Sequence, residues 1–221
     1  MNSGPKLLPL GDRALLIHFG DEIDLGRNGR VHALDARLQQ SLPDGVIETV
    51  AAYATLLVHY DPLRLTSAQV TDWLKAELDR VAEAAAREPR RIEVPVRYGG
   101  EGGPDLPFVA SYHHTTPAEI VRQHAGRDYT VFMMGFTPGF PYMGKLEEAI
   151  ATPRLETPRT RVPAGSVGIA GSQTGIYPID SPGGWRLIGH TALELFDPAA
   201  DQPFLFAPGD SVRFVVEALD A

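Results

Sequence analysis

Residues 161–189, RVPAGSVGIAGSQTGIYPIDSPGGWRLIG, decide the fold of the C-terminal part of this 221-residue chain. The stretch is rich in glycine, but it also carries Val, Ile, Tyr and Trp, which a flexible linker lacks. Glycine provides positive φ in turns, permits bulges, and lets backbone approach backbone or a ligand closely. Short β-prone segments punctuated by Pro and Gly continue after Tyr142, so the pattern predicts a small β-barrel or sandwich.

The N-terminal part has a different pattern. Residues 12–20 predict a strand, a helix begins at an Asn28 cap and ends before PDG at 43–45, and residues 46–53 and 55–61 predict two strands. Thr66 and Gln69 form a capping box for a helix through about residue 87, and a strand follows at 90–98. This β-α-β-β-α-β order is that of a ferredoxin-like α+β unit. We therefore place an α+β domain at 1–89 and a β-barrel domain at 90–221, although the strand at 90–98 fits either domain.

Between these two patterns, residues 105–114 and 116–126 predict short helices, and residues 128–136 predict a strong strand. The short strands expected after Tyr142 are VGIAG, TGIYPI, WRLIGHT, LELFD and DSVRFVVE.

Composition excludes several classes of protein. The net charge of -8 and pI near 5.3 disfavour nucleic acid as a partner. The absence of cysteine excludes disulfide frameworks, thiolate metal sites and thiol nucleophiles. No stretch is apolar enough for a signal peptide or a membrane span, so we expect a cytoplasmic protein.

The glycine-rich stretch carries neutral hydrogen-bonding side chains between apolar positions, at Ser166, Ser172, Gln173, Thr174 and Tyr177. Because side chains two apart on a strand share a face, Gln173 and Tyr177 are expected to point one way and Thr174 the other. One face is then able to line a polar pocket. The stretch has neither a P-loop nor a G-x-G-x-x-G pattern.

Residues 135–144, GFTPGFPYMG, predict a rigid aromatic loop, because two prolines restrict the backbone between Phe136, Phe140 and Tyr142. Such a loop either covers a core or forms an aromatic wall for a ligand or a partner chain. Arg159 and Arg161 lie two residues apart, and a pair of guanidiniums suits a carboxylate or phosphate. The alternative for both arginines is an ion pair with one of the many Asp and Glu residues.

Familiar catalytic patterns are absent. His113, His114 and His124 do not have metal-ligand spacing, and we interpret them as surface or core residues, so we expect no metal site. Asp180 is a candidate general base, but an Asp before Ser-Pro-Gly-Gly more often serves a turn. The sequence identifies no catalytic residue.

Three segments carry a family resemblance: GFTPGFPYMG, TPRTRVPAGSVGIAGSQTGIYPIDSPGGWRLIG and LFAPGDSVRF. They resemble the allophanate hydrolase subunit 1 family, also called the KipI-type family or the family of the 5-oxoprolinase B subunit. GDRALLIHFG, LLVHYDP and VPVRYGGEGGPDL match its N-terminal part, so the resemblance covers nearly the whole chain. It implies a small α+β domain followed by a cyclophilin-like β-barrel.

The resemblance also implies a function. Family members act with two further subunits: a related one, C, which is similar to allophanate hydrolase subunit 2, and a separate one, A. Together they cleave 5-oxoproline to L-glutamate, with ATP hydrolysis by the complex. On the matching positions the resemblance implies substrate contacts from Arg159, Arg161, Ser166, Gln173, Thr174 and Tyr177. It likewise implies an aromatic wall or partner interface from Phe136, Phe140, Tyr142 and Trp185.

Two alternatives come from the same family. One member inhibits a sporulation histidine kinase, so the chain is also interpretable as a protein-binding regulator whose exposed aromatic loop docks on a kinase. The name allophanate hydrolase raises urea-derived substrates, but the amidase chemistry of that system normally lies on another polypeptide.

Overall fold

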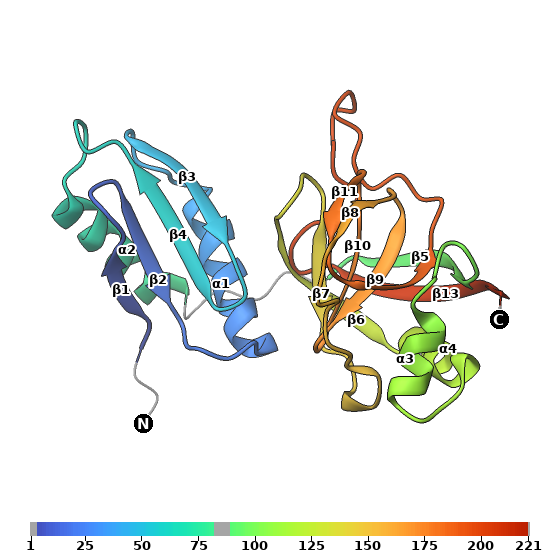
Figure 1. Ribbon diagram of the computed structural model, residues 1–221. Helices are drawn as coiled ribbons and strands as arrows, with labels where there is room; N and C mark the ends of the chain where they lie inside the picture. Colours follow the sequence, from blue (N-terminus) through green and yellow to red (C-terminus); the bar gives the residue numbers. More distant parts are fainter. Residues whose placement is uncertain (1–3, 82–88, 221) are drawn as a thin grey trace. The chain divides into compact units, whose positions relative to one another are not determined.

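The computed structural model describes residues 4–81 and 89–220 (Figure 1). The chain divides into two compact units, Met1–Glu88 and Pro89–Ala221. The predicted end of the second helix, near residue 87, lies outside the described residues. None of the helices within the described ranges is long and apolar enough to cross a membrane.

The first unit is a four-stranded antiparallel sheet with strand order β1-β2-β4-β3 and two helices. Leu15 and Ile17 of β2 share one buried face with residues of β4, and both helices pack against that face. The elements of this unit are β1 (Lys6–Pro9), β2 (Ala14–His18), α1 (Leu25–Leu38), β3 (Val46–Ala51), β4 (Thr55–Tyr60) and α2 (Ser67–Val81).

The observed element order in this unit is β-β-α-β-β-α, which differs from the predicted β-α-β-β-α-β. The sequence pattern missed β1, which forms a hairpin with β2 and pairs Lys6 with His18. The strand at the end of the predicted order, Arg91–Gly99, pairs with strands of the second unit instead. The fourth strand of the first sheet is therefore β1, which precedes β2 in the chain.

The predicted cap of α1 at Asn28 is wrong. Asp24 is the N-cap residue, and its carboxylate accepts a hydrogen bond from the backbone N–H of Arg27. Asn28 is buried inside the helix, where its amide donates to the backbone carbonyls of Ala52 and Tyr53. Asp and Asn are both favourable N-cap residues. Asn28 is instead used for its tertiary contacts with the backbone, and Asp24 takes the cap position. The helix also ends at Leu38 rather than continuing to the PDG turn.

The predicted capping box of α2 is confirmed. The backbone N–H of Gln69 donates to Thr66 Oγ1 at 3.3 Å, and the backbone N–H of Thr66 donates to Gln69 Oε1 at 2.8 Å. Val70 and Leu74 of this helix are fully buried in the core of the first unit.

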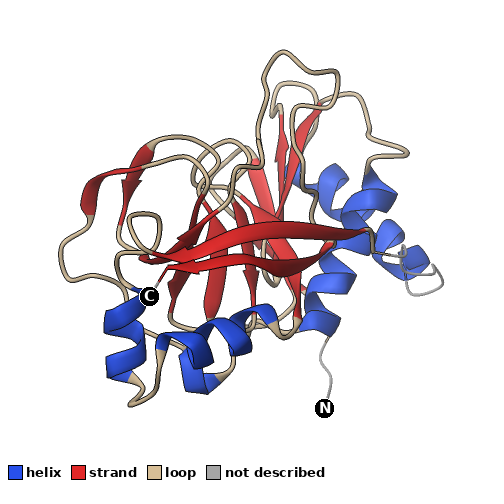
Figure 2. Cartoon of the chain, turned by 90° about the vertical axis from the view of Figure 1, so that its right-hand side faces the viewer, coloured by secondary structure: helices blue, strands red, loops and turns tan. Residues whose placement is uncertain are grey.

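The second unit is a closed β-barrel with strand order β10-β7-β6-β13-β5-β12-β9. Figures 1 and 2 show the barrel strands with the two helices α3 and α4 together on one side. A separate two-stranded ribbon is formed by β8 and β11. The elements are β5 (Arg91–Gly99), α3 (Leu106–Tyr112), α4 (Pro117–Ala125), β6 (Asp128–Met134), β7 (Pro141–Gly144), η1 (Glu148–Ile150), β8 (Arg159–Val162), β9 (Ser166–Ala170), β10 (Gln173–Ile176), β11 (Ser181–Gly183), β12 (Arg186–His190) and β13 (Ser211–Asp220).

The barrel wall confirms most of the predicted strands, with local differences. Residues 193–197 (LELFD) are not a strand and make only an isolated bridge between Phe196 and Phe204. The sequence pattern did not separate β7 from the aromatic loop, and it missed β8 and β11. These three strands have three or four residues each, too few to show an alternating pattern.

Two apolar layers use opposite faces of the same barrel strands. Met143, Ile169 and Ile188 belong to the main core, which also contains apolar residues of α3 and α4. Tyr142 and Leu187, each one position away from a main-core residue, belong to a second cluster. Because successive strand residues point to opposite faces, the second cluster lies on the outer face of the barrel wall.

Candidate functional site

The second cluster contains four aromatic rings that sequence analysis had singled out. Phe140 is at its centre, with ring centroids 4.8 Å from Tyr142, 5.2 Å from Tyr177 and 5.4 Å from Trp185. Most of these contacts are edge-to-face, the arrangement that aromatic pairs favour. We call these four residues the aromatic cluster. Phe140, Tyr177 and Trp185 are buried, and Tyr142 is half-buried at its edge.

Two glycines make room for this cluster. A Cβ at Gly175 would lie 3.0 Å from the Phe140 ring, and a Cβ at Gly183 would lie 2.3 Å from the Tyr177 hydroxyl oxygen. These distances are shorter than ordinary van der Waals contact, so a side chain at either position would displace a ring. Part of the glycine content of residues 161–189 is therefore explained by ring packing.

The segment before the cluster exposes one aromatic side chain. Phe136 is 61% exposed and has φ of 64°, a conformation that bulky residues rarely adopt. Its ring contacts Phe140 edge-on at 5.7 Å. A shallow groove of about 330 Å³ lies beside it and is lined by Met134, Gly135, Phe136, Thr137, Pro138, Gly139 and Phe204. The predicted aromatic loop thus has one member at the surface and one, Phe140, in a core.

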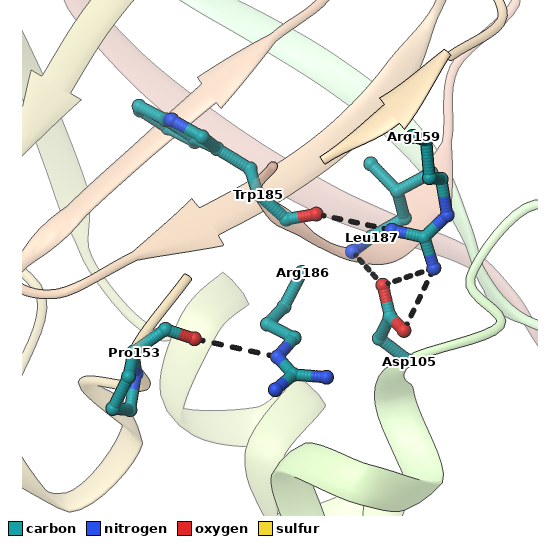
Figure 3. Close-up of polar contacts among 6 residues, drawn as sticks. All are labelled: Asp105, Pro153, Arg159, Trp185, Arg186 and Leu187. Atoms are coloured by element: carbon teal, nitrogen blue, oxygen red, sulfur yellow. Dashed lines mark hydrogen bonds and ion pairs between the residues drawn. The ribbon is translucent and has the colours of Figure 1, made fainter. Parts of the chain in front are cut away.

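Arg159 forms an intramolecular ion pair (Figure 3). Its Nη2 donates to both carboxylate oxygens of Asp105, at 2.8 and 2.9 Å, and its Nη1 donates to the Trp185 carbonyl. Asp105 also accepts from the backbone N–H of Leu187 at 2.7 Å. The pair therefore joins the start of α3 to β8 and β12, which is the alternative that sequence analysis left open for this arginine.

Arg161 forms an ion pair at the surface. Its guanidinium lies 2.6 Å from Asp180 Oδ2, while Oδ1 accepts from the backbone N–H of Ala164. The Ala164 hydrogen bond, followed by the Arg161 contact, lowers the pKa of Asp180. A carboxylate with a lowered pKa is a weaker base, so this geometry fits the turn role of Asp180 better than general-base catalysis.

The remaining predicted contact residues do not share one site, and the neighbours Gln173 and Thr174 point to opposite faces of β10. Ser166 is buried at the start of β9, opposite His190 of β12. Gln173 pairs with Gly144 and Ala170 at the start of β10. Thr174 is fully buried, on the opposite face from the aromatic cluster. The structure therefore brings together the aromatic residues but does not bring these polar residues to one place. Their roles stay predictions.

Thr174 belongs to a buried polar network with His124. Thr174 Oγ1 donates to the Gly168 carbonyl, so it accepts from His124 Nε2 at 2.9 Å. The other ring nitrogen, Nδ1, then accepts from the Tyr98 hydroxyl at 2.8 Å. Burial lowers the pKa of His124 to about 3 and raises that of Tyr98 well above its ordinary value. His124 is a neutral core residue, as one of the two sequence interpretations held.

Arg154 was not predicted. Its guanidinium carbon lies 5.8 Å from the centroid of the Trp185 ring, and the side chain is exposed. Arg154 belongs to no recognised motif. Its contact with Trp185 forms only in the folded chain, where the segment before β8 lies against the start of β12. Arg154 adds a positive charge to the edge of the aromatic cluster.

A larger hollow of about 670 Å³ lies near the end of α4. Its charges are mostly neutralised within the chain, since Arg122 pairs with Glu119 and Arg127 pairs with Glu147. Across the described ranges, no three His, Asp or Glu side chains are grouped so that they could hold a metal ion.

Comparison with known proteins places this architecture in a family. The family model described as "Carboxyltransferase domain, subdomain C and D" matches residues 5–206. The chain belongs to this family. Within it, the chain is 44% identical over 216 residues to the Bacillus subtilis protein named as the B subunit of 5-oxoprolinase, covering 93% of this chain and 90% of that protein.

Solved structures of similar proteins have the same fold. The protein TTHA0988 superposes with a TM-score of 0.82 at 40% identity, covering 92% of this chain. This chain spans only 40% of that longer protein. The K. lactis urea amidolyase superposes with a TM-score of 0.78 at 19% identity, covering 97% of this chain and 15% of that one. At that identity the likeness shows the fold alone.

Proposed function

We propose that this chain is one of the subunits of a 5-oxoprolinase complex that cleaves 5-oxoproline to L-glutamate. The observation that carries the proposal is the 44% identity to the B subunit of 5-oxoprolinase over nearly the full length of both chains. In this proposal the chain acts with two further subunits, A and the related C, and lies in the cytoplasm. We further propose that the barrel is of the cyclophilin-like type. The first unit departs from the ferredoxin-like order, because β1 supplies its fourth strand.

The chemistry of the proposed reaction requires activation of a stable amide. Phosphorylation of the lactam carbonyl oxygen by ATP would create a better electrophile for ring opening, and the complex would use ATP for this step. The glycine-rich stretch of this chain does not fit a phosphate loop, because β9, β10 and β12 use its backbone in barrel pairing. The proposal therefore places no ATP contact there.

The proposal is tested by reconstitution. The chain is purified alone and together with the A and C subunits, and 5-oxoproline-dependent ATP hydrolysis and glutamate release are measured. We expect activity only in the full mixture. Equal glutamate release from a mixture that lacks this chain would contradict the proposal.

A protein-binding regulator is the second candidate function. The exposed Phe136 side chain beside an apolar groove favours it, since such surfaces often bind other proteins. Inhibition of histidine kinase autophosphorylation by the purified chain, in the absence of 5-oxoprolinase activity in the mixture, would support this candidate. Loss of that inhibition in Phe136→Ser would assign it to the groove.

A further inference from the structure

Three arginines lie on β8 or in the segment before it, and their interaction partners differ. Arg159 and Arg161 each have an aspartate partner, Asp105 and Asp180. Arg154 is exposed, and within the described part of the chain no carboxylate forms an ion pair with it. Of the three arginines, Arg154 is therefore the one whose N–H donors are available to bind an acidic ligand.

The backbone around Arg154 is held in place on both sides. The carbonyl of Thr152 accepts from the Gly171 N–H at 2.7 Å, and the Leu155 N–H donates to the Gly184 carbonyl at 2.8 Å. Between them, Arg186 Nε donates to the Pro153 carbonyl (Figure 3). Long surface side chains usually lose much conformational entropy when they bind a ligand. Here the backbone is fixed, and the guanidinium already lies over the Trp185 ring.

The positive charge of Arg154 influences two tyrosines of the aromatic cluster, Tyr142 and Tyr177. The charge of Arg154 opposes the increase in pKa that burial causes at both Tyr142 and Tyr177. Tyr142 is also within ring-contact distance of Trp185, with centroids 5.9 Å apart. The exposed guanidinium of Arg154 and the half-buried ring of Tyr142 therefore both lie beside the Trp185 ring.

This pairing suits a particular class of ligand. A guanidinium binds a carboxylate through two parallel hydrogen bonds, and an aromatic ring supports a flat or ring-shaped apolar body. We infer that Arg154 binds the carboxylate of a small cyclic acid whose ring lies against Tyr142. If the proposed function holds, on which the identity of the acid rests, that acid is 5-oxoproline.

The test uses the fluorescence of Trp185 in the full chain. The chain has two tryptophans, so Trp73→Phe leaves Trp185 as the reporter. We expect saturable quenching by 5-oxoproline, and an about 10- to 100-fold higher dissociation constant in Arg154→Ala, as expected for lost charged hydrogen bonds. Arg154→Lys should recover part of the affinity. The analogue 2-pyrrolidinone has the ring without the carboxylate, and it should bind the parent about as weakly as 5-oxoproline binds Arg154→Ala.

Arg122→Ala is the matched control, because it removes another exposed arginine from the same unit, and it should leave the titration unchanged. The inference is overturned if Arg154→Ala binds 5-oxoproline like the parent, if 2-pyrrolidinone binds as tightly as 5-oxoproline, or if no saturable quenching occurs. In the reconstituted complex, Arg154→Ala should raise KM much more than it lowers kcat. A complex without turnover would refute the proposed function, while the titration would still decide the role of Arg154.

Discussion

At the scale of single residues, the buried His124 predicts how stability depends on pH. Burial lowers its pKa in the folded state to about 3, from an ordinary value of 6.5, so between these values the unfolded chain binds more protons. The stabilisation is complete above pH 6.5 and is lost as pH falls. From pH 6.5 to 5 this residue should account for a loss of about 1.5 kcal/mol in the free energy of unfolding. Urea denaturation at both pH values measures it.

His124→Gln is the matched variant, because glutamine is polar but does not titrate. Its free energy of unfolding should depend on pH less steeply than that of the parent over the same range. Parallel pH profiles for the two proteins would show that His124 is not the neutral, buried group described above.

The two arginine pairs should differ in what they contribute to stability. The Asp105 side chain is only 10% exposed and accepts from both Arg159 and the backbone of Leu187. Asp105→Ala should therefore cost about 3 kcal/mol of unfolding free energy, since it leaves a partly buried guanidinium and an N–H unpaired. Asp180→Ala at the exposed pair should change stability little. Similar urea midpoints for the two variants would contradict this difference.

Residue identities alone could not have assigned these partners. Arg159 was recognised as a carboxylate-binding side chain, but its carboxylate, Asp105, is 54 residues away in the chain. The alternation of Thr174 and Tyr177 between two faces was predictable from strand geometry. The contact of Arg154 with Trp185 was not, because it depends on how the segment before β8 folds against Trp185.

At the scale of elements, the β8–β11 ribbon depends on a glycine. A Cβ at Gly183 would lie 2.3 Å from the Tyr177 oxygen, whereas one at the adjacent Gly184 would lie at an ordinary 3.5 Å from Pro158. Gly183→Ala should therefore destabilise the protein by about 1–3 kcal/mol through overpacking, and Gly184→Ala should not. Thermal unfolding of the two neighbouring variants makes the comparison, and equal melting temperatures would contradict it.

Element prediction succeeded where the pattern was long and failed where it was short. The helix α2 has a capping box and a buried stripe that are both visible in the sequence. Strands β1, β7, β8 and β11 have three or four residues each, and their pairing partners rather than their own composition make them strands.

At the scale of the whole molecule, each unit has its own core. The core of the first unit contains residues of its sheet and both helices, and the barrel has a separate main core. A fragment of residues 89–221 should therefore fold alone and unfold in one cooperative transition, which calorimetry and circular dichroism measure. A fragment without a cooperative transition would show that the barrel needs the first unit.

The parallel pairing of β5 with β13 also bears on how the protein is made. The first and last strands of the barrel lie side by side, and Arg90 bonds to Asp210 although 120 residues separate them. During synthesis, the first unit emerges from the ribosome with all its partners present, but the barrel lacks the strand that joins β5 to β6 until residues 211–220 have been translated. Barrel closure is thus a late event of biosynthesis, and until then the edges of β5 and β6 are open to chaperones or to a neighbouring nascent chain.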